Sequence, residues 1–494
     1  MAVKVLEEQP KEIHPWLRTI KVAFVPGWMD DALRQVTEGV LTYLRSTGHK
    51  VVDTPDDETD AIITTARFGE LIDWRASLLM TARRRYKLSH SPVPFTYVSI
   101  QKDEFHRYLE LFDRFIQEEA PDPDRYQFPG LAPRAYRVLY EQGRRGGPIL
   151  SFERLVQAQT KCLRIVLIVC DGEKIKEAYH FDLVGAYPKS RADDLQRFYE
   201  DIALRMVTVL STQEVTNHEV VGEPIPRELW DRLETPKAMI RAAHELDRRG
   251  FFTEMVRIPD LVHVPAVGDA IATQYSEGCF ATYDPVIQGL VATVTGSARP
   301  VDKGKISEDD LAVIVGVKPA GDGALVRHVV GKRNDPPSSE AVEMMDMDEL
   351  LPRIAWEDDA TGRREVPVAR SKLHGHRGVA SFDPRHVEFV PLDPPYYNYL
   401  VSCATQAQAR GIKQAFSRSE ALRHPEDPRQ MVFTVLPGHG VVMVEKWVQG
   451  KAPFDVMLKY MDAGYIEIES RIPQGKFTYV PSSDGKMVIS LQDE

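Results

Sequence analysis

The stretch TIKVAFVPGWMDDALRQVTEGVLTYLRSTGHKVVD, residues 19–53, decides the fold class. Its first nine residues are a β-rich run that ends at Pro26 and Gly27, and its last five residues are a second apolar run. Between the two runs, apolar residues recur at the spacing of one helix face, namely Leu33, Val36, Val40, Leu41 and Leu44. Gly48 follows at the position of a helix C-cap. The stretch therefore predicts a strand, a helix and a second strand.

Two more runs, DAIITTA at 60–66 and PFTYVSI at 94–100, continue this alternation. Strands that alternate with helices over short links form parallel sheets with helices on both faces. We therefore expect an N-terminal α/β domain over residues 1–118. Residues 119–148 are rich in Pro, Gly, Arg and Asp, and we interpret them as a linker or long loop.

The rest of the chain divides by its pattern into two further parts. We expect a second α/β domain over residues 149–310, where a strand pair around Asp171 and Gly172 precedes two amphipathic helices. Over residues 311–494, short β-rich runs alternate with Gly, Pro and Asp turns, which favours a β-barrel-like domain. The expected fold class is therefore α/β, with parallel-sheet domains first and a β-barrel-like domain last.

Composition and charge exclude several classes of protein. The chain has 494 residues, of which 43% are hydrophobic, so we expect a globular protein rather than a disordered one. Its net charge of −11 argues against a general nucleic-acid or anionic-membrane binder. No apolar run approaches the ~18 residues of a membrane span, and the first residues lack the apolar core of a secretion signal. The four cysteines form no CxxC pair, which suits a reducing cytoplasm: Cys162, Cys170, Cys279 and Cys403.

Acidic residues surround a cysteine in the most unusual stretch of the chain. Glu277 and Asp284 lie on either side of Cys279 in SEGCFATYD. Carboxylates can bind a divalent cation or move protons, but a surface turn with solvated acids has the same composition. Cys279 is either a small buried hydrophobe or a nucleophile, and a nucleophile would need a base such as His263.

Three histidines are further candidates. His439 lies between two glycines directly before an apolar strand, where it either caps that strand or is free to ligate a metal ion. Glu445 shares its strand face but would lie about 20 Å away along an extended strand, so the two cannot share one ion. His374 and His376 would point to the same side of a strand, a spacing that metal sites use, although a solvated loop pair is the commoner origin.

Three stretches of the C-terminal half resemble the L-fucose isomerase and arabinose isomerase group of sugar isomerases. They are SEGCFATYDPVIQGLVATVTGSARPVD at 276–302, SEDDLAVIVGV at 307–317 and PGHGVVMVEKWVQGKAPFDVMLKYMDAGYIEIE at 437–469. The likeness covers about the last 230 residues, and residues 20–240 only in architecture. It implies α/β domains first and a β-barrel-like domain last.

The resemblance also implies a reaction and a set of site residues. In that family, two acidic residues and a C-terminal histidine hold a Mn²⁺-type cation, and an enediol proton transfer interconverts aldose and ketose. His439 matches the histidine, Glu277 matches one acid, and Asp284 is the candidate for the second. We therefore expect Mn²⁺ or Mg²⁺ as cofactor, with Glu277 and Asp284 as catalytic residues and Glu277, Asp284 and His439 as ligands. A sugar or polyol substrate, a cytoplasmic location and a homo-oligomer complete this expectation.

A relative that kept the fold and lost the metal, and that only binds carbohydrate or builds an assembly, is the alternative. The enzyme requires a carboxylate of Glu277 or Asp284 and the ring of His439 within about 6 Å of one centre. The binding protein would instead show aromatic side chains along a cleft, from Tyr275, Tyr283, Tyr396 and Tyr397.

Overall fold

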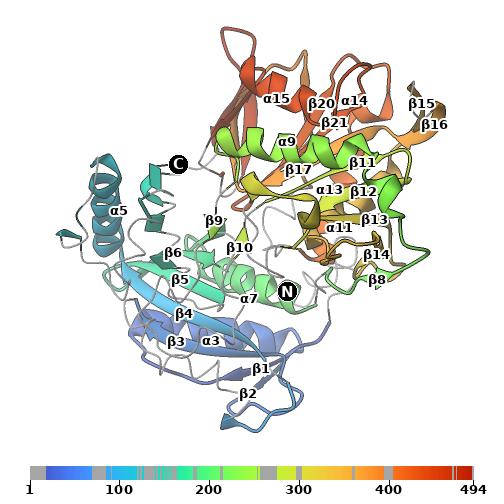
Figure 1. The fold of residues 1–494 in the computed structure, drawn as a ribbon. Helices are drawn as coiled ribbons and strands as arrows, with labels where there is room; N and C mark the ends of the chain where they lie inside the picture. The colour runs from blue at the N-terminus through green and yellow to red at the C-terminus, as the bar shows by residue number, and fades with distance from the viewer. Residues whose placement is uncertain are drawn as a thin grey trace. The chain divides into compact units, whose positions relative to one another are not determined.

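The computed structural model in Figure 1 describes eleven longer stretches of the chain and short pieces between them. The longer stretches are 18–68, 85–90, 92–118, 164–181, 186–211, 215–252, 278–295, 303–358, 362–393, 404–469 and 476–491. The chain forms two compact units. Unit 1 comprises Met1–Thr212, Val256–Thr273 and Tyr397–Val401, and unit 2 comprises Gln213–Met255, Gln274–Tyr396 and Ser402–Glu494.

Unit 1 contains a seven-stranded sheet in the order β2-β1-β3-β4-β5-β6-β7. Its strands are β1 (Lys21–Phe24), β2 (Lys50–Val52), β3 (Ala61–Arg67), β4 (Val93–Gln101), β5 (Arg164–Asp171), β6 (Lys174–Phe181) and β7 (Ala186–Arg191). The first five strands in the sheet are parallel, and β6 and β7 are added antiparallel to them. Strand order reverses between β1 and β3, as in doubly wound sheets.

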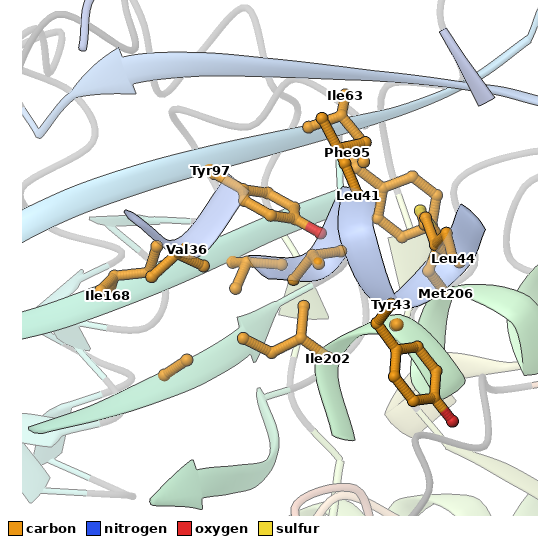
Figure 2. Packing of buried hydrophobic residues seen from close by; sticks show 14 of the residues in the cluster. Val36, Leu41, Tyr43, Leu44, Ile63, Phe95, Tyr97, Ile168, Ile202 and Met206 are labelled. Atoms are coloured by element: carbon orange, nitrogen blue, oxygen red, sulfur yellow. The ribbon is translucent and has the colours of Figure 1, made fainter. Parts of the chain in front are cut away.

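Helices cover both faces of this sheet. Figure 2 shows Val36 and Leu41 of α3 (Asp31–Ser46) with Ile202 of α7 (Leu195–Ser211), packed against Tyr97 and Ile168 of the sheet. Residues of the opposite parity in β4 and β5 join a second core with α5 (Lys102–Gln117), as alternation along a strand requires. The parallel, helix-covered sheet expected from the sequence is therefore present.

The stretch 19–53 folds as its pattern predicts. It contains β1, α3 and β2 in that order. Asp30 caps α3 by accepting a hydrogen bond from the backbone N–H of Leu33 at 2.7 Å. Gly48, just beyond the helix, has φ +87°, a left-handed conformation that ends helices and that glycine adopts without a steric penalty.

Unit 2 is built on a nine-stranded sheet in the order β19-β20-β21-β17-β11-β12-β13-β14-β8. These strands are β8 (Glu219–Val220), β11 (Cys279–Asp284), β12 (Gly289–Thr293), β13 (Leu311–Val317), β14 (Ala324–Arg327), β17 (Ala369–Gly375), β19 (Val387–Phe389), β20 (Met431–Leu436) and β21 (Gly440–Lys446). The central strands are antiparallel, and the two edge strands are parallel to their neighbours.

Helices lie on both faces of the nine-stranded sheet (Figure 1). On one face, α11 (Ser339–Asp346) packs against α13 (Gln406–Ser417) and shares a core with Cys279 and Ala281. On the other face, Phe280 stacks on Phe252 and contacts Phe454, which precedes α15 (Asp455–Asp462). The helix α9 (Glu234–Arg248) contacts β11 and α15.

The remaining elements of unit 2 are short. A four-stranded sheet has the order β22-β18-β24-β23, and a hairpin pairs β15 with β16. Their bounds are β15 (Arg353–Asp358), β16 (Gly362–Pro367), β18 (Gly378–Phe382), β22 (Ile466–Glu469), β23 (Phe477–Pro481) and β24 (Met487–Leu491). Three further pieces are α8 (Arg227–Trp230), α14 (Glu420–Arg423) and the antiparallel pair of β9 (Glu254–Met255) with β10 (Tyr275–Ser276). Short 3₁₀ turns are η3 (Lys303–Lys305), η4 (Glu308–Asp310) and η5 (Met347–Leu350).

The division of the chain differs from the expected one. The expected linker 119–148 separates β4 from β5, yet these two strands are neighbours in one sheet. The expected boundary at 310/311 falls between β12 and β13, which also pair. Strand pairing crosses both the expected linker and the expected boundary. This is possible because hydrogen bonding between two strands does not depend on the composition of the segment that joins them.

The barrel expected at the C-terminus is not confirmed. Over the described residues, no hydrogen-bonded ladder joins the two edge strands β19 and β8. Over the described residues, the main sheet of unit 2 is open and has helices on both faces. Within the same residues, none of the helices combines the length and the apolar character needed to cross a bilayer.

Candidate metal centre

Four side chains from three parts of unit 2 converge in its interior. Glu340 comes from α11, His374 from the end of β17, His376 from the residues directly after β17, and His439 from the turn between β20 and β21. Each offers one possible ligand atom, and these atoms all lie within 4.8 Å of one another. We call this group the His₃Glu cluster. It could hold a metal ion.

The pairing of β17 with β21 brings the three histidines together. His374 pairs with Val442 and Gly375 with Val441, so the end of β17 lies beside the start of β21. Ring centroids are 5.3 Å apart between His374 and His376, and 4.8 Å apart from each of these to His439. His374 and His376 therefore point to the same side, as their spacing predicts.

Glycine makes this close approach possible. Gly438 has φ +72° in the three-residue loop that joins β20 to β21, a conformation that few other residues adopt. A Cβ atom at Gly440 would collide with the carbonyl oxygen of Gly375. The two glycines that flank His439 therefore fix its position next to β17.

The cluster is shielded from water. Glu340, His374 and His439 expose 8%, 1% and 2% of their surfaces. Both ring nitrogens of His376 are also inaccessible to solvent. Polar groups at this depth need partners, because an uncompensated buried charge is costly.

The contact between His374 and Glu340 is the most informative in the cluster. His374 Nδ1 lies 3.1 Å from the carbonyl oxygen of Val441. A carbonyl only accepts, so Nδ1 carries the proton, and a neutral imidazole then has a lone pair on Nε2. That Nε2 lies 3.2 Å from a carboxylate oxygen of Glu340. Two electron-pair donors facing each other call for a cation, either a metal ion between them or a proton on the ring.

Electrostatics keep the carboxylate charged and one imidazole neutral. Burial would raise the pKa of Glu340, but the neighbouring histidines outweigh burial and hold that pKa well below its ordinary value. Burial lowers the pKa of His439 well below its ordinary value, and the two other histidines act in the same direction. A carboxylate is the form of Glu340 that binds a metal ion, and a neutral imidazole is the form of His439 that does so.

Two of the spacings within the cluster also fit an ion. Ligand atoms about 2.1 Å from one metal ion lie roughly 3 to 4 Å apart. Glu340 Oε1 is 3.2 Å from His374 Nε2 and 3.8 Å from His439 Nε2. The bond from His374 Nδ1 to a backbone carbonyl is the outer contact that metal-binding histidines usually make.

Buried polar contacts hold α11 against the sheet. Lys372, two residues before His374, forms a 2.6 Å ion pair with Asp348 and donates to the carbonyl oxygen of Met344 at 2.6 Å. One turn after Glu340, Glu343 accepts a 2.9 Å hydrogen bond from Gln408 of α13. These contacts fix the helix that carries Glu340.

Of the three expected ligands, the structure places His439 in the cluster. Glu277 lies outside the described residues. Asp284 is buried at the far end of β11, where its carboxylate accepts hydrogen bonds from the backbone N–H groups of Val286 and Ile287 at 2.8 and 3.1 Å. Cys279, at the other end of β11, pairs with His374, so Asp284 is about 16 Å along the strand from the cluster. The structure does not bring Asp284 and His439 together.

Other sequence candidates have structural roles. Glu445 is buried on the sheet face opposite His374, where it accepts from the hydroxyl of Ser371 and from the backbone N–H groups of Phe454 and Met457 at the start of α15. Tyr283 belongs to the core beneath α11. The side chains of Tyr275, Tyr396 and Tyr397, and the possible base His263, lie outside the described residues.

Sequence reasoning did not assign three members of the cluster, His374, His376 and Glu340, to the metal site. His374 and His376 were noticed, but their interpretation as a solvated loop pair is wrong, because the imidazole nitrogens are buried. The sequence signal for burial of these two histidines was their place at the end of the β-rich run ARSKLHGH. Glu340 carried no signal, because an acid in the first turn of a helix is common.

No protein-family model, curated protein or solved structure matches this chain. The likeness to sugar isomerases therefore stays an expectation, and the geometry of the cluster carries the functional argument.

Proposed function

We propose that this protein is a metal-dependent enzyme whose active centre is the His₃Glu cluster. The observation that carries the proposal is the approach of His374 Nε2 to the Glu340 carboxylate at 3.2 Å while His374 Nδ1 faces a carbonyl. A divalent ion would satisfy both electron-pair donors at once, and the two other histidines would also be available to hold it.

The donor set selects a class of metal. Three imidazoles and one carboxylate suit Mn²⁺, Fe²⁺, Co²⁺ or Zn²⁺. Mg²⁺ prefers oxygen ligands and water. Of the two expected ions, Mn²⁺ therefore fits this donor set better, and the other transition metals named above fit it as well. If the bound ion takes six ligands, the four protein ligands would leave room for substrate oxygens.

The reaction that we propose is the aldose–ketose interconversion implied by the resemblance. His439, the histidine that the resemblance singles out, is among the four candidate ligands. A bound divalent ion would stabilise the negative charge that develops on the substrate oxygens when a carbon-bound proton is removed. Glu340 and the histidines would hold that ion, and Glu277 stays the candidate base. A homo-oligomer and a cytoplasmic location belong to the same proposal, because they were expected together with the sugar isomerase activity.

A structural metal site without catalysis is the second candidate. All four possible ligands are shielded from solvent, and four protein ligands around a tetrahedral Zn²⁺ would close the site. The coordination number of the bound ion therefore separates the two candidates, since a six-coordinate ion would stay open to a substrate and a tetrahedral one would not.

Metal analysis of purified protein, followed by a screen of aldoses for ketose formation, tests the proposal. We expect one equivalent of metal per wild-type chain and a loss of more than about hundredfold in affinity for His374→Ala and His439→Ala. His424→Ala is the matched control, because this exposed histidine lies outside the cluster. Absence of metal binding across Mn²⁺, Fe²⁺, Co²⁺ and Zn²⁺ would overturn both candidates. Metal binding without turnover of any aldose would favour the structural site.

A further inference from the structure

A link of two residues joins the nine-stranded and four-stranded sheets of unit 2, and it carries one of the candidate ligands. β17 of the larger sheet ends at Gly375, and β18 of the smaller sheet begins at Gly378. His376 and Arg377 form the link and belong to neither strand. Cross-strand pairing fixes Gly375 and Gly378 on either side of it. Strand pairing alone therefore does not fix the ring of His376.

The other candidate ligands are held more directly. His374 lies within β17, and its Nδ1 is 3.1 Å from the carbonyl oxygen of Val441. Glu340 lies in the first turn of α11, and the glycines on both sides of His439 fix that residue next to β17. His376 lies outside any strand or helix, so its position depends on the residues next to it.

Arg377 ties the link to the C-terminal end of α9. Its guanidinium donates a hydrogen bond to the carbonyl oxygen of Gly250, two residues beyond that helix. Arg377 exposes only 6% of its surface. A hydrogen bond from a charged donor is stronger than one between neutral groups, and the carbonyl groups at a helix C-terminus carry partial negative charge. The residue directly after His376 is therefore held from outside both sheets.

The end of α9 is well fixed. Gly250 has φ +70°, and its N–H donates to the carbonyl oxygen of Asp247 at 2.7 Å. The N–H of the next residue, Phe251, donates to the carbonyl oxygen of Leu246 at 3.0 Å. These two hydrogen bonds are the Schellman motif, which closes a helix C-terminus and orients the residues after it. The carbonyl that receives Arg377 and the ring of Phe251 are thus placed by the helix.

Phe251 holds the chain on the other side of His376. Gly375 lies between His374 and His376, so a side chain at this position would point to the opposite face of the sheet. A Cβ atom at Gly375 would lie 2.1 Å from a ring carbon of Phe251, a residue that exposes only 2% of its surface. The ring fills the space that glycine leaves. The end of α9 therefore contacts the residue before His376 and the residue after it.

We propose that the C-terminal end of α9 positions His376 for metal binding, with Arg377 and Phe251 as the positioning residues. Without their contacts, the link between the two sheets would turn, and the ion would keep three protein ligands instead of four. The number of protein ligands sets how much room is left for a substrate. This inference rests on the proposed metal centre and adds the residues that control its ligand number.

Titration of the full-length chain with Co²⁺ tests the inference. We expect Arg377→Met to weaken Co²⁺ binding at least tenfold, the usual loss when a residue that orients a ligand is removed. X-ray absorption of the Co²⁺-loaded variant should show two imidazole nitrogens instead of three. Loss of a positive charge near a cation would by itself strengthen binding, so a weaker Kd is not a charge effect. Arg377→Lys, which keeps a donor for the carbonyl of Gly250, should recover most of the affinity.

A double-variant cycle distinguishes positioning from a general loss of structure. If Arg377 acts through His376, Arg377→Met should change the Kd less than about threefold in a chain that already carries His376→Ala. Independent effects would instead multiply. Arg385→Met is the matched control, because this arginine of the same segment pairs with Asp383 and its side chain is 79% exposed. It should leave the Kd for Co²⁺ unchanged.

Substitution of Gly375 tests the contact on the other side of His376. Gly375→Ala should weaken Co²⁺ binding at least tenfold, because its Cβ atom collides with the ring of Phe251. In a chain that already carries Phe251→Ala, the space is empty and Gly375→Ala should cost less than about threefold. Urea unfolding identifies a variant that does not fold, and this second pair then carries the test if Arg377→Met is such a variant.

The contrary results are equally distinct. An unchanged Kd or three remaining imidazoles in folded Arg377→Met, or losses that multiply with His376→Ala, would overturn the role of Arg377 while leaving the metal centre standing. An equal cost of Gly375→Ala with and without Phe251 would overturn the role of that ring. Failure of wild-type protein to bind Co²⁺ would remove the metal centre itself, and this inference with it.

Discussion

Glu340 and His374 meet through atoms that repel each other unless a cation lies between them. The backbone carbonyl of Val441 decides this, because it fixes the proton of His374 on Nδ1. A single hydrogen bond outside the cluster thus sets which nitrogen faces the carboxylate. His376 and His439 complete a set of donors that no single element of the chain could supply.

The buried cysteines make a prediction at the same scale. Burial raises the pKa of Cys170 to about 12 and that of Cys279 to about 11. Because the thiolate is the reactive form, at pH 8 only about one Cys279 thiol in a thousand is ionised, against about one in four for an ordinary cysteine. We expect neither residue to react with iodoacetamide at pH 8 in folded protein, and both to react after unfolding. Peptide mapping by mass spectrometry checks this, and rapid labelling of folded Cys279 would contradict it.

At the scale of elements, the position of α11 relative to β17 determines whether the cluster forms. A buried ion pair joins Lys372 of β17 to Asp348 of η5, the turn directly after α11. It therefore holds the C-terminal end of α11 close to the strand. Removing one partner leaves the other charge buried and alone. We expect Lys372→Met to lower the free energy of unfolding by about 3–5 kcal/mol, and to weaken metal binding because Glu340 is displaced.

A double variant is the control for this prediction. Lys372→Met with Asp348→Leu removes both charges, and it should recover most of the lost stability. Urea unfolding of the single and double variants gives the measurement. A double variant less stable than Lys372→Met alone would show that the pair does not act as a unit.

Local patterns in the sequence predicted local structure well. The run of 19–53 gave β1, α3 and β2 because apolar spacing and the cap at Gly48 are properties of neighbouring residues. The turn at Asp171 and Gly172 likewise joins β5 to β6. What the sequence could not provide was the pairing of β17 with both β11 and β21, strands far apart along the chain. That pairing brings His374 beside His439, and it leaves Asp284 at the wrong end of β11.

At the scale of the molecule, unit 2 is assembled from three separate segments of the chain. The expected C-terminal domain, 311–494, omits β11 and β12, which lie in the sheet between β17 and β13. Both missing strands are fully buried. We expect a fragment of residues 311–494 to remain unfolded and to bind no metal, because its sheet is interrupted at the centre.

Circular dichroism and metal titration of this fragment, beside the full chain, check the prediction. A fragment that unfolds cooperatively and binds one equivalent of metal would contradict it. Such a result would restore the boundary at 310/311 that the change in sequence character suggested.

X-ray absorption spectroscopy of the metal-loaded wild-type protein tests the central claim most directly. We predict one ion per chain with its nearest ligands at about 2.0–2.2 Å, including three imidazole nitrogens. The imidazole scattering should diminish in His374→Ala and stay unchanged in His424→Ala. A nearest shell of oxygen atoms without imidazole scattering, or an identical spectrum in His374→Ala, would contradict the account.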